Sequence, residues 1–221
     1  YFHAAGVRAE FIGNPNFQAA WRARGDGAAF RARHRLGDAP LLAVMLGSRK
    51  TEVRRLSGPF GEAVEMLADR IPGLRVVSAV APSVDRLARA RLSTFAGDPV
   101  IVGAEEKNDA MAAANVGLTA SGTASTELAI NRTPMVVGYR LDPVTAIWAR
   151  AVLKTPYVSI INVAGGRFVI PELLQEDCNG PSLAGALLQL FNNPEIYVEQ
   201  ASAFDTILKS LAVDAAPAAD I

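Results

Sequence analysis

Hydrophobic residues in this chain form short continuous runs, separated by longer stretches in which apolar positions recur with helical spacing. Five runs have the length of a buried strand: residues 41–46, 75–80, 99–102, 115–119 and 134–138. A continuous apolar run predicts a strand that is covered on both faces. Strands that alternate with helices predict a parallel sheet with helices on both faces, joined by right-handed crossovers. The expected fold class is therefore α/β.

Turn and capping residues mark the ends of the helices between these strands. The predicted markers are Pro59, Gly73, Ser83 with Asp85, Gly97 and Asn131. Residues 83–95 alternate arginine and leucine with helical spacing, which predicts a helix that covers the sheet.

Short helices are also predicted on both sides of the strand-rich part. Residues 16–36 predict one or two of them, with a break at residues 25–27 and a stop at Gly37. Residues 181–192 and 195–211 predict two closing helices.

The segment between the last predicted strand and the closing helices is less regular. An apolar stretch at residues 157–161 precedes a Gly-containing loop at 162–167, and Pro171 predicts the start of a helix. Residues 212–221 predict a frayed, disordered tail.

The most specific chemical signal is Ser121-Gly122-Thr123, which separates the apolar run at 115–119 from a helical stretch. The first turn of a helix has unpaired backbone N–H groups and a partial positive charge. A glycine lets an anion approach these groups closely, so the segment predicts a phosphate site. The alternative is a Ser or Thr that only caps a core helix.

A second junction of the same kind follows the run at 41–46, where Gly47-Ser48-Arg49 leads into another helical stretch. In an open parallel sheet, ligands bind at the carboxyl ends of the strands, so both junctions are expected at one crevice. Arg49 offers a planar fork of donors to a phosphate. A cation at a helix start opposes the helix dipole, and we therefore interpret Arg49 as the partner of an anionic ligand rather than a solvated residue.

Composition and charge exclude several classes of protein. The 22 basic residues balance 22 acidic ones, which gives no electrostatic case for a nucleic-acid partner. The single Cys178 excludes an intramolecular disulfide framework, and the two histidines have no partners at metal-ligand spacing, so no metal site is expected. No apolar run reaches the roughly 18–20 residues that a membrane-spanning helix needs.

One local cluster of charge remains, in residues 22–35. Its five arginines predict a solvated helix face, or, as the alternative, attraction to anionic lipid head groups. The members are Arg22, Arg24, Arg31, Arg33 and Arg35.

Five segments in one order and spacing resemble the lipid-A-disaccharide synthase family. They are residues 46–53 (LGSRKTEV), 120–129 (ASGTASTELA), 134–140 (PMVVGYR), 154–159 (KTPYVS) and 171–175 (PELLQ). The resemblance extends from about residue 6 to residue 191. It implies the Rossmann-like, C-terminal half of a two-domain GT-B glycosyltransferase.

The resemblance also implies an activity and its partners. The enzyme transfers 2,3-diacylglucosamine from its UDP conjugate to 2,3-diacylglucosamine 1-phosphate, and releases UDP and the β-1,6-linked lipid A disaccharide. The resemblance implies that the enzyme needs no metal and no cofactor. It also implies a cytoplasmic location at the inner face of the inner membrane of a Gram-negative cell, and it is compatible with a homodimer.

The same resemblance divides the chain into three parts. Residues 1–37 are expected to join an acceptor domain that lies outside this sequence, residues 38–211 to bind the UDP-sugar, and residues 212–221 to form the tail. The general base is expected in the acceptor domain, so the chain alone is expected to be inactive and its catalytic base is unknown.

The resemblance finally implies a set of donor-binding residues. They are Gly47, Ser48, Arg49, Ser121, Gly122, Thr123, Glu127, Asn162 and Arg167. Glu127 is expected either to accept hydrogen bonds from the ribose hydroxyls or to pair with Arg132. Asn162 and Arg167 are expected to bind the sugar or pyrophosphate, or else to form a plain turn, and backbone groups of residues 103–107 are expected to hold the base.

Departures from the family pattern and two other functions leave alternatives open. Asn14 replaces a usual His, Ile161 a usual Pro, and Phe168 a usual acidic residue, which puts the hinge and the 160–170 loop in doubt. The alternatives are another GT-B enzyme such as a UDP-N-acetylglucosamine epimerase, or a noncatalytic nucleotide-binding module. No G-x-G-x-x-G follows a predicted strand, which argues against a dinucleotide site.

Overall fold

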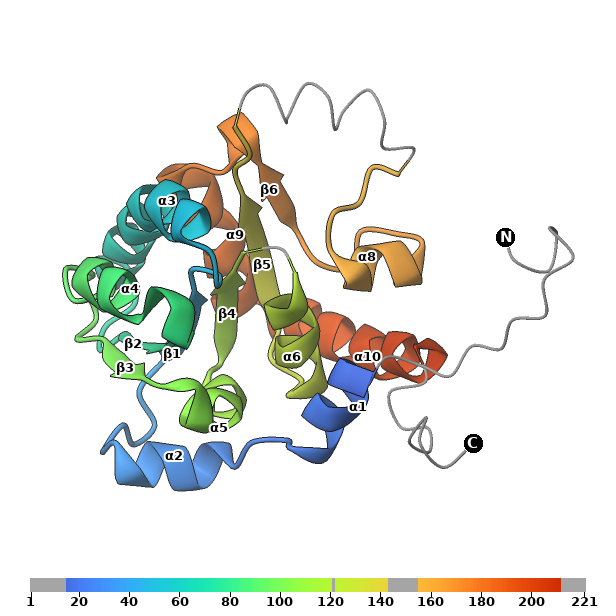
Figure 1. The fold of residues 1–221 in the computed structure, drawn as a ribbon, viewed down its shortest axis with the longest axis horizontal. Helices are drawn as coiled ribbons and strands as arrows, with labels where there is room; N and C mark the ends of the chain where they lie inside the picture. The colour runs from blue at the N-terminus through green and yellow to red at the C-terminus, as the bar shows by residue number, and fades with distance from the viewer. Residues whose placement is uncertain (1–14, 121, 143–154, 212–221) are drawn as a thin grey trace, which may run out of the picture.

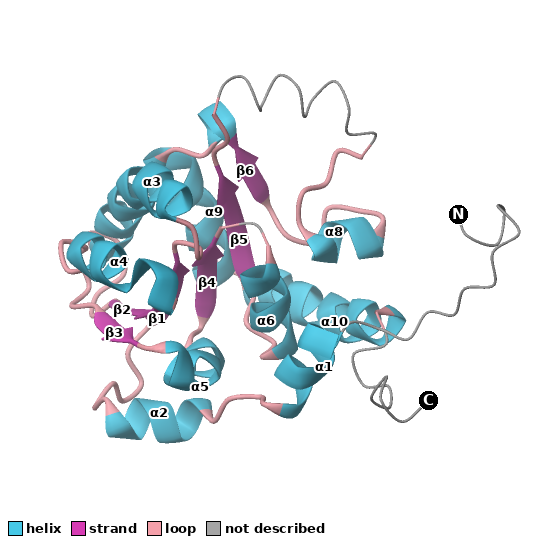
Figure 2. Cartoon of the chain, viewed as in Figure 1, coloured by secondary structure: helices cyan, strands magenta, loops and turns pink. Residues whose placement is uncertain are grey.

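The fold is a six-stranded parallel sheet with helices on both faces (Figures 1 and 2). The computed structural model describes residues 15–120, 122–142 and 155–211. The strand order is β3-β2-β1-β4-β5-β6. The strands are β1 Leu41–Met45, β2 Arg75–Ala79, β3 Val100–Val102, β4 Val116–Thr119, β5 Met135–Tyr139 and β6 Glu172–Leu174. The predicted α/β class and the first five strands are confirmed.

The helices alternate with the strands along most of the chain. They are α1 Pro15–Arg22, α2 Gly27–Arg33, α3 Lys50–Ala68, α4 Asp85–Leu92, α5 Lys107–Ala113, α6 Thr123–Ile130, α8 Ile160–Gly165, α9 Gly180–Asn192 and α10 Pro194–Ser210. Short 3-10 turns lie at Pro82–Val84, Ala104–Glu106 and Gln175–Asp177. The two short helices before the sheet, the helix within 83–95 and the two closing helices are as predicted.

Strand β1 shows why two layers of helices are needed. All five of its residues are buried, and successive side chains of a strand point to opposite faces. Leu42 and Val44 belong to a core with α3, α4 and α9, whereas Leu41, Ala43 and Met45 belong to a second core with α2, α5, α6, α8 and α10. The continuous apolar run in the sequence therefore records burial on both faces, as Figure 1 shows for the two helical layers.

Strand β6 was missed, and the helix predicted from Pro171 is wrong. Pro171 precedes an edge strand whose backbone pairs with β5, and its carbonyl oxygen accepts a 2.9 Å hydrogen bond from the N–H of Val137. An edge position tolerates a proline beside it because the missing N–H leaves the other ladder bonds in place. The three residues Glu172–Leu174 are too few to predict a buried strand, and each of them is only partly buried.

Two predicted helix ends also differ. Pro59 lies inside α3, where it is buried, so that the helix continues through it from Lys50 to Ala68. The helix α2 ends at Arg33 rather than at Gly37, because Arg35 adopts a left-handed conformation with φ 54° and the N–H of Leu36 returns to the Arg31 oxygen at 2.9 Å.

The segment before the sheet belongs to the second core. Phe30 is fully buried there, and the Arg31 guanidinium donates to the backbone oxygens of Ala113, Gly37 and Ala39 at 2.8–3.0 Å. Arg33 forms an ion pair with Asp109 at 3.1 Å. The prediction of a merely solvated basic face is therefore wrong for Arg31, whose guanidinium joins α2 to the following chain, while the Arg33 side chain is 49% exposed.

Some predictions concern residues outside the described part of the chain. These are the joining role of residues 1–14, the hinge role of Asn14, the contribution of Ser121 and the tail at 212–221. Among the described residues, no helix combines the length and the apolar character needed to cross a bilayer.

Candidate functional site

The two small-residue junctions meet where the strand order reverses. Strands β1 and β4 are neighbours in the sheet, yet β1 leads to α3 in one layer and β4 leads to α6 in the other. Connections that diverge in this way leave a crevice at the carboxyl ends of the two strands. A cavity of about 410 Å³ lies there, and both Gly47-Ser48-Arg49 and Gly122-Thr123 line it. The predicted convergence of the two junctions is confirmed.

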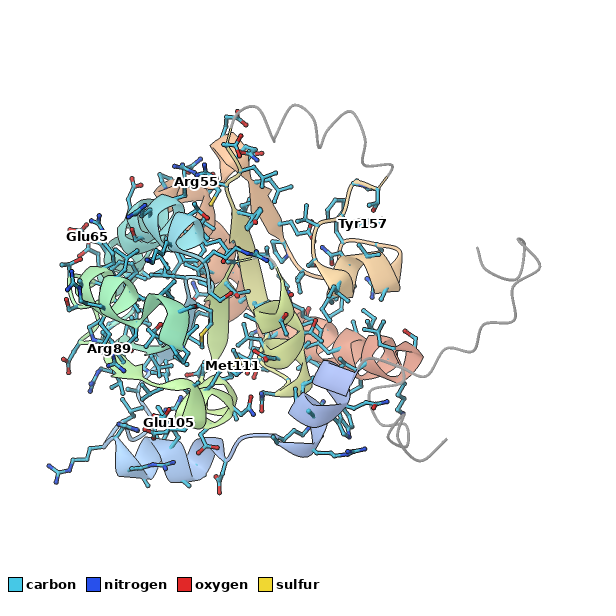
Figure 3. The ribbon with its side chains drawn as sticks, viewed as in Figure 1. Arg55, Glu65, Arg89, Glu105, Met111 and Tyr157 are labelled. Carbon is cyan, nitrogen blue, oxygen red and sulfur yellow. The ribbon has the colours of Figure 1, made fainter. Side chains whose placement is uncertain are left out.

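Further residues complete the wall of this cavity. Strands β1 and β2, the turn after β2 and the start of α3 contribute Met45, Glu52, Ala79, Val80, Ala81 and Pro82. The end of β4, the 3-10 turn Ala104–Glu106, α5 and α6 contribute Ala104, Lys107, Met111, Ala120, Ala124 and Glu127. Figure 3 shows Met111 between α5 and the sheet. The volume of the cavity is in the range of small-ligand sites, and its walls are apolar with a few charged groups.

At the first junction, the carboxylate of Glu52 occupies the start of α3. It accepts the backbone N–H groups of Ser48 at 3.0 Å and Arg49 at 3.2 Å, and the Arg49 guanidinium at 2.7 Å. The Glu52 side chain is 8% exposed and that of Arg49 is 73% exposed. Gly47 has φ 94°, and a Cβ there would stand 2.3 Å from Glu52 Oε2. Only glycine therefore allows the carboxylate to fold back over the turn.

The ion pair with Glu52 corrects the expectation that only an anionic ligand explains Arg49 at this helix start. The anion that offsets a cation at this helix start is Glu52, within the chain, so no ligand is required to explain the residue. Arg49 nevertheless lines the cavity, and Nη1 is the guanidinium nitrogen that bonds to Glu52. A guanidinium has five N–H groups, so donors remain for an anion in the cavity.

Arg49 and Tyr139 both hold their protons near neutral pH. The hydrogen bond that Arg49 donates to Glu52, and then the negative charge of Glu52, raise the pKa of Arg49 above its ordinary value. Burial and then the charge of Glu52 raise the pKa of Tyr139, at the end of β5. Arg49 is therefore a permanent cation and Tyr139 a neutral phenol.

The second junction has no side-chain cap among the described residues. The N-cap of α6 is Gly122, with φ 135° and ψ −151°, a conformation that side chains rarely adopt. Its carbonyl oxygen accepts the Ser125 hydroxyl at 2.7 Å. Thr123 is the first helical residue rather than the N-cap, so the capping alternative does not apply to its side chain. The start of α6 therefore presents backbone N–H groups beside the cavity.

Glu127 has a partner that was not predicted. Its Oε1 forms a 2.6 Å ion pair with the ammonium of Lys107, the first residue of α5. Arg132 instead pairs with Asp205 at 3.3 Å, so the predicted Glu127–Arg132 pair is wrong. Ala104 and Lys107 place part of the 103–107 segment in the cavity wall.

Asn162 and Arg167 are not brought into this cavity. Asn162 lies in α8 and is fully buried, and its amide donates to Ile170 O and Glu172 Oε1 and accepts from the N–H groups of Val169 and Ile170. The loop predicted at 162–167 is therefore helical as far as Gly165. Arg167 is 58% exposed and lies 3.6 Å from Glu199. The contacts of Asn162 give it a role within the chain, while the binding roles of Asn162 and Arg167 stay predictions.

Two charged residues of the cavity wall, Glu52 and Lys107, are absent from the predicted set of donor-binding residues. The position of Glu52, three residues after Arg49, was a readable signal, because a glutamate at the third helical position can fold back onto the helix start. Lys107 gave no such local signal, since its partner is twenty residues away in the chain.

Comparison with known proteins identifies the family. Residues 1–216 match the family model described as lipid-A-disaccharide synthetase. The chain is 39% identical over 195 residues to the lipid-A-disaccharide synthase of Granulibacter bethesdensis, covering 87% of this chain and 49% of that protein. It is 36% identical over 222 residues to the one of Gluconobacter oxydans, covering 100% and 53%. The chain thus spans about half the length of the curated relatives it matches.

Solved structures show the fold without close sequence similarity. A Staphylococcus aureus MnaA–UDP co-structure has a TM-score of 0.59 at 17% identity, over 91% of this chain and 52% of that one. A putative UDP-N-acetylglucosamine 2-epimerase from Listeria monocytogenes has a TM-score of 0.57 at 17% identity, over 92% and 53%. At 17% identity these neighbours show the fold alone, and they do not favour the epimerase alternative. The match along nearly the whole chain and the identities to named synthases show that this chain belongs to the lipid-A-disaccharide synthetase family.

Proposed function

We propose that the cavity between α3, α5 and α6 binds the UDP part of a UDP-sugar, so that the chain provides the donor side of a lipid-A-disaccharide synthase. The observation that carries this proposal is the convergence of two strand-to-helix junctions on one cavity at the reversal of strand order. Family membership supports the choice of a nucleotide sugar over other anions.

The diphosphate is assigned to the junctions. The start of α6 offers N–H groups and the positive end of a helix dipole, and the glycine N-cap keeps their approach open. Arg49 adds a fixed positive charge and N–H donors from the opposite layer of helices. Ser48 also lines the cavity. Its N–H is already bonded to Glu52, so we assign its hydroxyl rather than its N–H to the diphosphate.

The nucleoside is assigned to the wall formed by α5 and α6. Glu127 lies four residues after Thr123, which is about 6 Å along a helix. Its carboxylate is suited to the two ribose hydroxyls, because each carboxylate oxygen accepts hydrogen bonds. Ala104 lies in the same wall and leaves space for a flat base.

The proposed reaction breaks the bond between the anomeric carbon and the β-phosphate oxygen, whose electron pair leaves with UDP. The acceptor hydroxyl forms the new glycosidic bond and loses its proton. Negative charge therefore grows on the diphosphate, where Arg49 and the α6 start stabilise it more strongly in the transition state than in the substrate. We assign no general base to the described residues.

The remaining parts of the proposal follow from the family. They are a 2,3-diacylglucosamine donor and 1-phosphate acceptor, a β-1,6 disaccharide product, work at the inner face of the inner membrane, and a homodimer. Relatives named lipid-A-disaccharide synthase support the two substrates, and no contact in the described residues bears on the membrane or on the dimer.

Calorimetric titration of the chain with UDP, uridine and NAD tests the proposal. UDP is expected to bind, uridine to bind at least tenfold more weakly because it lacks the diphosphate, and NAD not to compete with UDP. Equal affinity for UDP and uridine would remove the diphosphate assignment. Tight binding of NAD without binding of UDP would instead support the dinucleotide module.

A further inference from the structure

The ion pair between Lys107 and Glu127 spans the two helices on one wall of the cavity. Lys107 begins α5, which follows β3, and Glu127 lies in the second turn of α6, which follows β4. Their charged atoms are 2.6 Å apart, and both side chains line the cavity. The pair is therefore part of the surface that a bound molecule meets.

This pair differs from the surface ion pairs of the same layer. The Glu127 side chain is 12% exposed, whereas the acids of the pairs with Arg132 and Arg167 are 38% and 71% exposed. A carboxylate so little exposed is costly to leave without a partner. The bond from Lys107 therefore fixes where the charge of Glu127 lies, which an exposed pair does not do.

One oxygen of this carboxylate remains available. Lys107 bonds to Oε1, while Oε2 makes no hydrogen bond within the described residues and is not sealed from solvent. A carboxylate held at one oxygen offers the other in a fixed place, which lowers the entropy lost when a ligand hydroxyl binds.

The pair also neutralises a negative charge in the wall of the cavity. Two acids, Glu52 and Glu127, line a space assigned to an anionic diphosphate. Arg49 neutralises the first and Lys107 the second. Without Lys107, the charge of Glu127 would stand uncompensated near the diphosphate and repel it.

We propose that Lys107 is a positioning residue that holds Glu127 for the ribose diol, and so sets the preference of the site for ribonucleotides over 2′-deoxyribonucleotides. This inference rests on the proposed function and goes beyond it, because Lys107 itself is not assigned to touch the ribose. If Lys107 only joined α5 to α6, its loss would weaken the binding of UDP and 2′-deoxy-UDP alike. If it positions Glu127, its loss weakens the binding of UDP more, because only UDP has the 2′-hydroxyl.

The test measures the ratio of the dissociation constants for 2′-deoxy-UDP and UDP by calorimetry, using the 221-residue chain. Variants are Lys107→Met, Lys107→Arg and Glu127→Gln. Arg132→Met is the matched control, because it breaks an ion pair next to the other end of α6, and Arg132 is not among the residues that line the cavity. Thermal melting of each variant shows how far the fold is weakened.

The parent is expected to prefer UDP by about tenfold, the size of a hydrogen bond to a charged group. Lys107→Met and Glu127→Gln should both reduce the ratio to less than about twofold, while Lys107→Arg restores it and Arg132→Met leaves it unchanged. If the parent binds UDP and Lys107→Met keeps the parental ratio, Lys107 does not position Glu127. If the parent does not bind UDP, the proposed function fails and this inference with it. Should Lys107→Met not fold, Lys107→Gln, which removes the charge but keeps a polar side chain, takes its place with the same two outcomes.

Discussion

Arg49 and Glu52 form a single charged unit at the mouth of the cavity, in which Nη1 of the arginine lies 2.7 Å from Oε1 of the glutamate. The same carboxylate accepts two backbone N–H groups at the start of α3. In the proposed complex, Arg49 acts on the diphosphate in two ways: it donates hydrogen bonds directly, and it neutralises the nearby carboxylate of Glu52. Substitution of Arg49 alone removes both effects together.

The first prediction separates the two effects. Arg49→Ala is expected to weaken UDP binding by about 1.5–3 kcal/mol, with Arg49→Lys recovering only part of this, and uridine is expected to be almost unaffected. Glu52→Gln keeps an oxygen for the helix start but removes the charge, so it isolates neutralisation.

The double variant Arg49→Ala with Glu52→Gln completes the cycle by calorimetry. If Arg49 grips the diphosphate, the double variant binds UDP nearly as weakly as Arg49→Ala. Recovery to parental affinity would mean that Arg49 serves only to neutralise Glu52.

The second prediction concerns Gly47, whose positive φ and contact with Glu52 both require glycine. Gly47→Ala is expected to lower the free energy of unfolding by about 1–3 kcal/mol. Gly185→Ala is the control, because Gly185 lies within α9 and a Cβ there meets no atom within 4 Å. It is expected to raise stability by about 0.5–1 kcal/mol through helix propensity. Urea unfolding measures both, and a neutral Gly47→Ala would contradict the geometry of this turn.

The third prediction assigns Asn162 to the fold. Asn162→Ala leaves the buried Ile170 backbone groups and Glu172 without the amide that joins them, and is expected to cost about 2–4 kcal/mol of stability. The folded variant should bind UDP with parental affinity. Asn193→Ala, which removes an exposed amide bonded to Gln189, should cost less than about 1 kcal/mol. A large loss of UDP affinity in folded Asn162→Ala would return this residue to the binding site.

The fourth prediction follows from Cys178, which is fully buried. Burial raises the pKa of its thiol above the ordinary value of 9.0, against a smaller lowering by Arg140. The native thiol thus holds its proton more tightly than the unfolded one. Its contribution to stability is constant below pH 9.0 and is lost as the pH rises beyond it.

Melting temperature measured from pH 7 to pH 11 tests this effect. Cys178→Ala is expected to show a shallower alkaline decline than the parent, with the raised pKa of Tyr139 contributing to the part that remains. At pH 8, a thiol reagent should react slowly with Cys178 in the native protein and rapidly with Cys178 in the protein unfolded by urea. Identical alkaline slopes for parent and variant would exclude Cys178 as a source.

Local patterns were enough to predict much of the fold. The strand β1 is an unbroken apolar run because both of its faces are covered, so the run in the sequence directly predicts a strand that is buried on both faces. The edge strand β6 is different, since Glu172 uses its carboxylate to accept the N–H groups of Val158 and Ser159. Its polar side chain serves a contact made in three dimensions, which no periodicity in the sequence indicates.

The candidate site was predictable to the same extent. The junctions at Gly47 and Gly122 are local events, in which a glycine sits between a strand and a helix, and they were found. The roles of Lys107 and Asn162 depend on which helix packs beside which strand. Sequence patterns indicated that Asn162 was polar and in a short segment, but not that the core surrounds it.

The last prediction concerns Gly122, the N-cap of α6. Alanine is strained at this position, because φ 135° with ψ −151° is a conformation almost reserved for glycine. A Cβ at this position meets no atom within 4 Å, so the cost is strain rather than a clash. In the proposed complex, the added methyl group would stand in the path of the diphosphate to the start of α6. Gly122→Ala is therefore expected to lose about 1–3 kcal/mol of stability and at least about tenfold in UDP affinity.

Gly166 provides the matched control for this variant. It also has a positive φ, 62°, with no atom within 4 Å of a Cβ, but it ends α8 outside the cavity. Gly166→Ala should cost about 1–2 kcal/mol of stability and leave UDP affinity unchanged. Calorimetry below the melting transition of each variant compares folded proteins only. If both variants bind UDP equally well, strain alone accounts for the glycine at position 122, and the diphosphate must be held by groups other than the start of α6.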